Sequence, residues 1–142
     1  MAEITNLIYG TKPHIIKRSC YKNFDYFIIK NTYGPCAYVV LNEEPNWDVF
    51  ELNQPHGGVT YNLGGLDFYI NNEVNETLVP EYKIVVGWDF MHADDYMAPP
   101  YNSNKFSQFM NGGTVWSLNM IEENVFNTID EIINKNLQSD VS

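Results

Sequence analysis

The last apolar segment of this chain has the spacing of a helix, whereas the apolar segments before it have the pattern of strands. In SLNMIEENVFNTIDEIINKNLQ the apolar residues fall on one stripe at helical spacing, which predicts a helix over 118–137. Asn119 and Glu122 have the spacing of a capping box at its start. We expect the stripe to pack on a sheet, with pairing to a second copy of the chain as the alternative use.

Five earlier segments have the composition of strands, since they combine aromatic and β-branched residues between clusters of Gly, Pro and Asn. The predicted strands are 24–30, 36–41, 59–61, 66–70 and 82–88. The first two form a predicted hairpin, and the apolar run YKIVVGW is typical of a central strand. The expected fold class is therefore α+β, a small and mostly antiparallel sheet packed by a C-terminal amphipathic helix, in a single domain of residues 1–142.

Two connections are also predicted. Segment 42–55, NEEPNWDVFELNQP, is predicted to be a connection with one helical turn, because its two prolines interrupt the strand pattern. DDYMAPPYNSNKFSQFMNGG (94–113) lacks a regular period. Irregular stretches of this length are uncommon in small domains and often form lids, so we expect a lid over a neighbouring site.

Charge is distributed unevenly along the chain, whose net charge is −10. Residues 1–35 hold five basic and two acidic side chains, whereas the rest holds three basic and 16 acidic ones. Such an acidic body repels a polyanion, which excludes DNA and RNA as the main ligand. A small phosphate-bearing anion can still be held if Lys17, Arg18 and Lys22 reach a pocket. The alternative is that these cations are a solvated strand face.

The sequence contains no apolar run near the ~20 residues of a membrane span, and MAEITNLIYG lacks the features of a signal peptide. We therefore expect a protein of the cytoplasm without membrane contact. Cys20 and Cys36 form neither a disulfide framework nor a zinc pattern, and we expect reduced thiols.

Two polar motifs, HGGVTYN (56–62) and VGWDFMHADDY (86–96), form the candidate site. In the first, Gly57 and Gly58 can adopt positive φ and point backbone N–H groups at a ligand oxygen, with His56 at the edge. The second follows an apolar strand, and sites are often built at strand ends.

In the second motif an extended backbone places Trp88 and Asp89 on opposite sides, and a turn after them can bring Asp89, His92 and Asp95 together. These groups can bind a divalent metal or act as a general acid and base on a phosphoester. They can equally recognise a nucleotide, with carboxylates on hydroxyls and Trp88 or Tyr61 on a purine. A purely structural use in turns is the third alternative.

The two motifs together resemble a family of small proteins from bacteriophages and prophages, in which an HGG-[LV]-TY motif precedes a G-[FW]-D-x-x-H-x-G-D motif; Gly87, Trp88, Asp89, His92 and Asp95 match the second motif. Asp94 stands where that family usually has glycine. The resemblance implies a phage context, in which small single-domain proteins counter host defence, and several such groups are oligomeric proteins that sequester nucleotide immune signals.

The leading expectation from this resemblance is a phage anti-defence protein of the host cytoplasm that sequesters a cyclic nucleotide, most of all a cyclic ADP-ribose derivative. It implies no catalytic residue, cofactor or metal, and allows a homo-oligomer. The expected ligand-binding residues are His56, Gly57, Gly58, Thr60, Tyr61, Trp88, Asp89, His92 and Asp95.

Two rival functions remain open. A hydrolase of the same signals would use His56 and His92 as acid and base, or a metal held by Asp89, His92 and Asp95. An acidic protein inhibitor would mimic nucleic acid and block a host defence effector.

Overall fold

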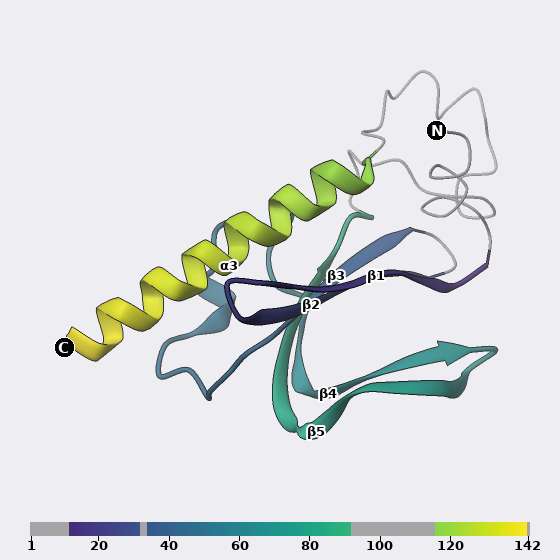
Figure 1. The fold of residues 1–142 in the computed structure, drawn as a ribbon, viewed down its shortest axis with the longest axis horizontal. Helices are drawn as coiled ribbons and strands as arrows, with labels where there is room; N and C mark the ends of the chain where they lie inside the picture. The colour runs from purple at the N-terminus through teal and green to yellow at the C-terminus, as the bar shows by residue number, and fades with distance from the viewer. Residues whose placement is uncertain (1–11, 32–33, 92–115, 142) are drawn as a thin grey trace.

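The computed structural model describes residues 12–31, 34–91 and 116–141. Its elements are β1 (His14–Tyr21), β2 (Phe24–Lys30), β3 (Pro35–Val40), the short 3₁₀ helix η1 (Val49–Glu51), β4 (Tyr61–Ile70), β5 (Glu73–Asp89) and α3 (Leu118–Val141). The strands form one antiparallel sheet in the order β1-β2-β3-β5-β4, and α3 packs against one of its faces (Figure 1). The predicted α+β class is confirmed.

Most predicted elements are present, with several corrections, and the strand predicted at 82–88 is the end of the longer β5. The predicted hairpin is β2–β3. The apolar run YKIVVGW belongs to β5, which lies between β3 and β4 in the sheet. The helical turn predicted in segment 42–55 is η1. The predicted strand 66–70 lies within β4, but the predicted break at Gly64 and Gly65 is wrong, because β4 begins at Tyr61 and runs through both glycines. The edge strand β1 was not predicted, since HIIKRSCY mixes charged and apolar residues. Helix α3 extends to residue 141 rather than 137.

The start of α3 differs from the predicted capping box. Ser117, not Asn119, caps it: its Oγ accepts from the backbone N–H of Met120 at 3.2 Å. Glu122 bonds instead to Lys17 and to the hydroxyl of Tyr26, both at 2.7 Å. No helix in the described part of the chain combines the length and apolar character needed to cross a membrane.

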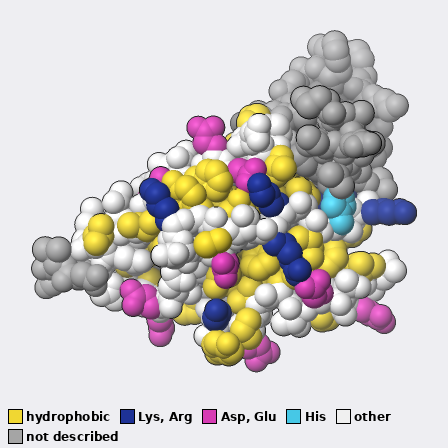
Figure 2. All heavy atoms as spheres, viewed as in Figure 1, with side chains coloured by type: hydrophobic (Ala, Val, Ile, Leu, Met, Phe, Trp, Pro, Cys, Tyr) yellow, Lys and Arg dark blue, Asp and Glu magenta, His cyan; other side chains and the backbone are white. Residues whose placement is uncertain are grey.

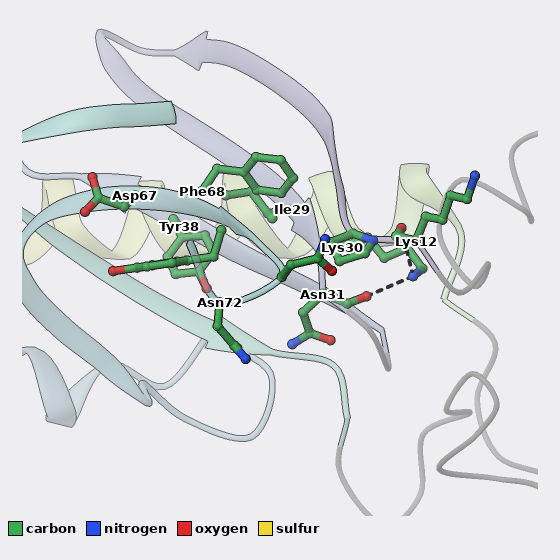
Figure 3. Close-up of a pocket in the computed structure, with 11 residues that line it drawn as sticks. Lys12, Ile29, Lys30, Asn31, Tyr38, Asp67, Phe68 and Asn72 are labelled. Carbon is green, nitrogen blue, oxygen red and sulfur yellow. Dashed lines mark hydrogen bonds between the residues drawn. The ribbon is translucent and has the colours of Figure 1, made fainter. Parts of the chain in front are cut away.

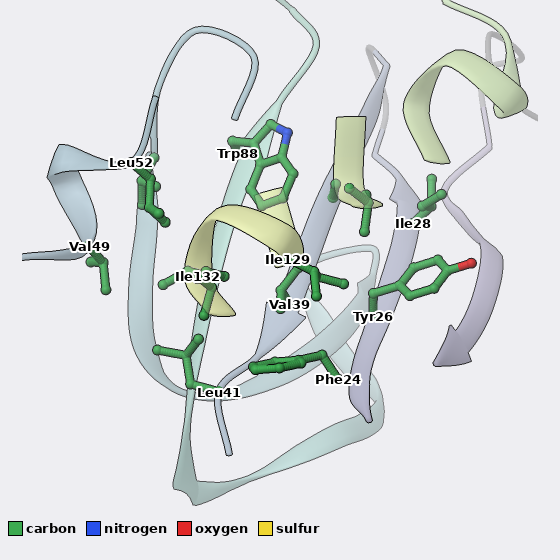
Figure 4. Packing of buried hydrophobic residues seen from close by; sticks show 14 of the residues in the cluster. Phe24, Tyr26, Ile28, Val39, Leu41, Val49, Leu52, Trp88, Ile129 and Ile132 are labelled. Atoms are coloured by element: carbon green, nitrogen blue, oxygen red, sulfur yellow. The ribbon is translucent and has the colours of Figure 1, made fainter. Parts of the chain in front are cut away.

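The sheet has a hydrophobic cluster on each face, because side chains alternate along a strand. Along β2, Tyr26 and Ile28 pack towards α3, whereas Phe27 and Ile29 belong to the other cluster. On the α3 side, the predicted helical stripe supplies four residues with no exposed surface (Figure 4). They are Ile121, Val125, Ile129 and Ile132. The stripe is thus used for packing on the sheet, as expected.

The outer half of the β4–β5 hairpin covers the second face (Figure 1). The hairpin bends where Gly64 pairs with Ile84 but Leu66 pairs with Val79, so that residues 80–83 bulge out of the ladder. Gly65 adopts a φ of 80° at this bend, a conformation that favours glycine. Beyond the bend, Leu66, Phe68 and Val79 pack on Phe27, Ile29 and Val40 in the second cluster.

The folded-over hairpin reaches across the sheet to the opposite edge. Arg18 of β1 forms an ion pair with Glu76 of β5, although these two strands are not neighbours in the sheet. The sheet therefore lies between α3 on one side and the outer hairpin on the other.

Candidate functional site

The first polar motif forms a tight turn on the α3 side of the sheet. Gly57 and Gly58 have φ of 72° and 90°, and a backbone hydrogen bond of 2.9 Å closes the turn at Gly58. The ring of His56 lies parallel to Phe90, with centroids 5.4 Å apart, and 4.6 Å from the ring of Trp116. His56 is therefore part of an aromatic cluster.

Asn124 of α3 connects this turn to the second motif. Its Oδ1 accepts from the backbone N–H of His56 at 3.1 Å and from the indole Nε1 of Trp88 at 2.9 Å, and its Nδ2 donates to the Gln54 carbonyl at 2.8 Å. Trp88 is 1% exposed and belongs to the cluster under α3. This burial leaves no face of the indole for a ligand to stack on.

Asp89 points to the other face of the sheet, as the alternation with Trp88 predicts. It pairs with Cys36 of β3, and its Oδ1 accepts from the backbone N–H of Met91 at 3.0 Å. Burial, and then the negative charge of Asp89, raise the pKa of the Cys36 thiol to about 12, which keeps this thiol protonated and unreactive. The sheet thus separates Asp89 from His56, and these two residues do not line one pocket.

Thr60 and Tyr61 lie where β4 begins. The backbone N–H of Thr60 donates to the Gly87 carbonyl at 2.9 Å, and the Thr60 side chain is exposed. The Tyr61 hydroxyl donates to the Gly65 carbonyl at 2.8 Å, and its ring packs edge-on against Tyr38 at 5.3 Å. Tyr61 therefore supports the bend of the hairpin on the second face.

His92 and Asp95, with the predicted lid 94–113, lie outside the described residues. Within the described ranges, no three His, Cys, Asp or Glu side chains are grouped as a metal ion would require. Of the nine predicted site residues, the structure brings His56, Gly57, Gly58 and Trp88 together on the α3 side, and places Tyr61 and Asp89 on the second face.

A cavity of about 650 Å³ lies on the second face, between the end of β2 and the tip of the β4–β5 hairpin (Figure 3). Its walls combine aromatic, cationic and carboxylate side chains. The principal lining residues are Lys12, Lys30, Tyr38, Asp67, Phe68 and Tyr69. Pro13, Ile29 and three asparagines, Asn31, Asn71 and Asn72, also line it. The last two have φ of 53° and 65° and form the two-residue turn at the hairpin tip.

The two ends of this cavity differ in charge. Figure 3 shows Lys12, Lys30 and Asn31 at one end and Asp67 at the other, with Tyr38 and Phe68 between them. Lys30 has no exposed surface, and burial lowers the pKa of its ammonium. At that end the exposed cation is Lys12, and Asp67 supplies a carboxylate at the other end.

The other N-terminal cations do not line this cavity. Lys17 is paired with Glu122, Arg18 with Glu76 and Lys22 with Asp130. Hydrogen bonding to Asp130 raises the pKa of Lys22. Figure 2 shows basic and acidic side chains interspersed over the visible face rather than a continuous basic patch.

Sequence reasoning did not single out the residues of this cavity. Lys30 ends the apolar segment FDYFIIK, and Asp67, Phe68 and Tyr69 lie in a segment predicted only as a strand. The available signal was the Gly64-Gly65 pair, because paired glycines inside a strand pattern mark a bend or a close backbone approach.

No protein-family model, curated protein or solved structure matches this chain.

Proposed function

We propose that this chain is a bacteriophage anti-defence protein that binds and sequesters a small cyclic nucleotide, with a cyclic ADP-ribose derivative as the first candidate. The observation that carries the proposal is the cavity of about 650 Å³ on the second face of the sheet. Its size falls within the ~300–1,000 Å³ of small-molecule sites. The proposed site is therefore this cavity, rather than a pocket built from both polar motifs.

The lining supports a ligand with a planar base and sugar hydroxyls. Tyr69 provides aromatic surface on which a base can stack, because it is 53% exposed and its ring can turn towards a ligand. The amides of Asn71 and Asn72 can donate to and accept from base edges, and the Asp67 carboxylate can accept from a hydroxyl or an amine.

The position of the cavity supports sequestration. The hairpin tip that carries Asn71 and Asn72 folds over the sheet and forms one wall. We expect a ligand in this half-open pocket to dissociate slowly, because it contacts both the hairpin and the sheet. Slow release is the property that a sequestering protein requires.

The test is to incubate the purified protein with cyclic ADP-ribose isomers and cyclic dinucleotides, remove free ligand, denature the protein by heat and analyse what is released by mass-resolved chromatography. We expect intact cyclic nucleotide to appear only after denaturation. A linear product would identify a hydrolase instead. Recovery of all ligand in the wash would contradict nucleotide binding and favour the protein-inhibitor function.

A pair of tyrosine variants tests the location of the site. Tyr69→Ala should weaken binding about tenfold or more, because base stacking on an aromatic ring contributes about 1–3 kcal/mol. Tyr82→Ala is the matched control, since Tyr82 is 82% exposed on β5 and does not line the cavity. Equal affinity of the two variants in isothermal titration calorimetry would place the site elsewhere.

A further inference from the structure

Strand β4 presents an open backbone edge to the cavity. It is the last strand of the sheet, with β5 on one side and no strand of the described residues on the other. Three consecutive residues of β4 line the cavity, namely Asp67, Phe68 and Tyr69. Because successive side chains of a strand point to opposite faces, a lining by consecutive residues means that the edge of the strand borders the cavity.

The turn at the hairpin tip determines which backbone groups face this edge. Asn71 and Asn72 both have positive φ, as in a two-residue type I′ turn. Ile70 pairs with Glu73 across this turn, and such flanking residues exchange both of their hydrogen bonds. The next residue of β4, Tyr69, therefore directs its N–H and C=O groups away from β5, and the open edge carries a donor and an acceptor.

The side chains beside this edge differ between the two faces of β4. Phe68 is 6% exposed and belongs with Ile29 to the cluster on the second face, against which Tyr38 packs. Asp67 belongs to none of the ion pairs among the described residues, and Tyr69 is 53% exposed. A strand placed beside β4 therefore meets apolar surface with one set of its side chains and Asp67 and Tyr69 with the other.

The opposite edge strand, β1, is protected from such pairing. Its Lys17 forms an ion pair with Glu122 of α3, and its Arg18 forms one with Glu76 of the hairpin. Charged side chains on an edge strand discourage the addition of a further strand. In β4 the only charged residue is Asp67, so β4 is the edge that is open to a partner.

We propose that the β4 edge binds an extended peptide segment of a partner protein, in which apolar residues alternate with lysine or arginine. The segment pairs with β4 by strand addition. Its apolar side chains pack on Phe68 and Tyr38. Its cations lie beside the Asp67 carboxylate and the Tyr69 ring, where the opposite charge and a cation–π contact stabilise them. The inference goes beyond nucleotide binding, and a strand at this edge and a nucleotide in the cavity exclude each other.

Charge favours a basic partner over a second copy of this chain. The net charge of the chain is −10. Glu73 and Glu81 of β5 are exposed and belong to none of the ion pairs among the described residues. Two copies paired through β4 bring the carboxylates of both hairpins together, whereas a cationic segment is attracted to them.

The test begins with a random-peptide phage library selected on the purified wild-type protein. We expect enriched sequences in which lysine or arginine alternates with apolar residues. The most frequent peptide is synthesised with a fluorophore, and its affinity is measured by fluorescence anisotropy. Asp67→Asn should weaken its binding by about threefold to fivefold, through loss of the cross-strand charge pair. Glu81→Gln, at an exposed carboxylate that does not line the cavity, should leave the affinity unchanged.

Tyr69→Pro tests the backbone contact, with Tyr69→Ala as its control. Proline removes the N–H that faces the open edge and is tolerated at such edge positions, whereas alanine removes only the ring. We expect Tyr69→Pro to bind the peptide about tenfold or more weakly than Tyr69→Ala, because it loses a backbone hydrogen bond and crowds the incoming strand. If Tyr69→Pro does not fold, amide hydrogen exchange of wild type is measured with and without peptide, and we expect protection of the Tyr69 amide.

Three kinds of result would overturn the inference. The first is a selection that enriches no peptide, or only peptides without alternating cations. The second is equal peptide affinity of Tyr69→Pro and Tyr69→Ala, or a Tyr69 amide that the peptide leaves unprotected. The third is a wild-type dimer in light scattering that Tyr69→Pro makes monomeric, which assigns the edge to a second copy. Peptide binding without binding of any cyclic nucleotide supports this inference and contradicts the proposed function.

Discussion

The indole Nε1 of Trp88 donates to Oδ1 of Asn124 at 2.9 Å, and this side-chain hydrogen bond joins β5 to α3. Asn124 also binds the turn of the HGG motif through the backbone of Gln54 and His56. One amide on the helix thus holds two segments that are adjacent only in the folded chain.

Replacing Asn124 by alanine should lower the free energy of unfolding by about 1–3 kcal/mol, because Trp88 Nε1 loses its acceptor in the core. Urea unfolding followed by tryptophan fluorescence measures this change. Asn127→Ala is the control, since Asn127 is exposed on the same helix. Similar stability of the two variants would mean that the Asn124 bonds contribute nothing beyond helix propensity.

Gly64→Ala should destabilise the hairpin bend and reduce ligand binding at the cavity. A Cβ at Gly64 would lie 2.3 Å from the backbone carbonyl oxygen of Glu81, so the two strands must move apart. We expect a loss of about 1–3 kcal/mol in the free energy of unfolding, the range for overpacking. Urea unfolding measures the loss, and calorimetry with the cyclic nucleotide measures the affinity.

Gly58→Ala provides the comparison for that variant. Gly58 has a φ of 90°, but an added Cβ would meet nothing within 4 Å, and the site lies away from the cavity. Its substitution should cost stability through backbone strain alone and leave ligand affinity unchanged. A Gly64→Ala protein with wild-type affinity would show that the bend does not shape the cavity.

The buried phenol of Tyr26 should make the protein less stable at high pH. Burial, followed by the hydrogen bond to Glu122, raises the pKa of Tyr26 from 10.0 to about 12. Below pH 10 the phenol is protonated in both states and its contribution is fully present. Between pH 10 and 12 the unfolded chain loses the proton first, so the free energy of unfolding falls by up to about 2 kcal/mol from this group.

Urea unfolding at pH 8 to 11.5 tests this effect, with Tyr26→Phe and Tyr82→Phe compared to wild type. Tyr26→Phe should show a shallower decline above pH 10, because phenylalanine has no proton to lose. Tyr82 is 82% exposed, and its replacement should leave the decline unchanged. Parallel curves for wild type and Tyr26→Phe would assign the alkaline loss to other groups.

The elements with a strong hydrophobic period were predictable because period depends on local spacing alone. The spacing of Ile121, Val125, Ile129 and Ile132 requires a helix with one apolar face, and all four are buried against the sheet. Strand β1 was not predicted, because its sequence HIIKRSCY mixes charged and apolar residues and shows no regular hydrophobic period. The break at Gly64-Gly65 was visible, but a bend and a turn between two strands have the same local signal.

The residues that line the cavity were not predictable from the sequence, and none of them is among the nine predicted site residues. Alternation along a strand already placed Trp88 and Asp89 on opposite sides, but the sequence could not tell which side α3 would cover. Lys30 is the clearest case: at the end of FDYFIIK a lysine is expected to reach solvent, and here it has no exposed surface.

The amino-acid sequence by itself determined the fold class, the β2–β3 hairpin, the C-terminal helix and the acidic net charge, because each depends on composition or on spacing between near neighbours. Only the tertiary structure decided which face α3 buries, how the outer β4–β5 hairpin bends across the other face, and therefore that a cavity joins Lys30 of β2 to Asp67 of β4. These outcomes depend on contacts between residues distant in sequence, whose free energies are set by packing and desolvation of the whole domain rather than by any local pattern.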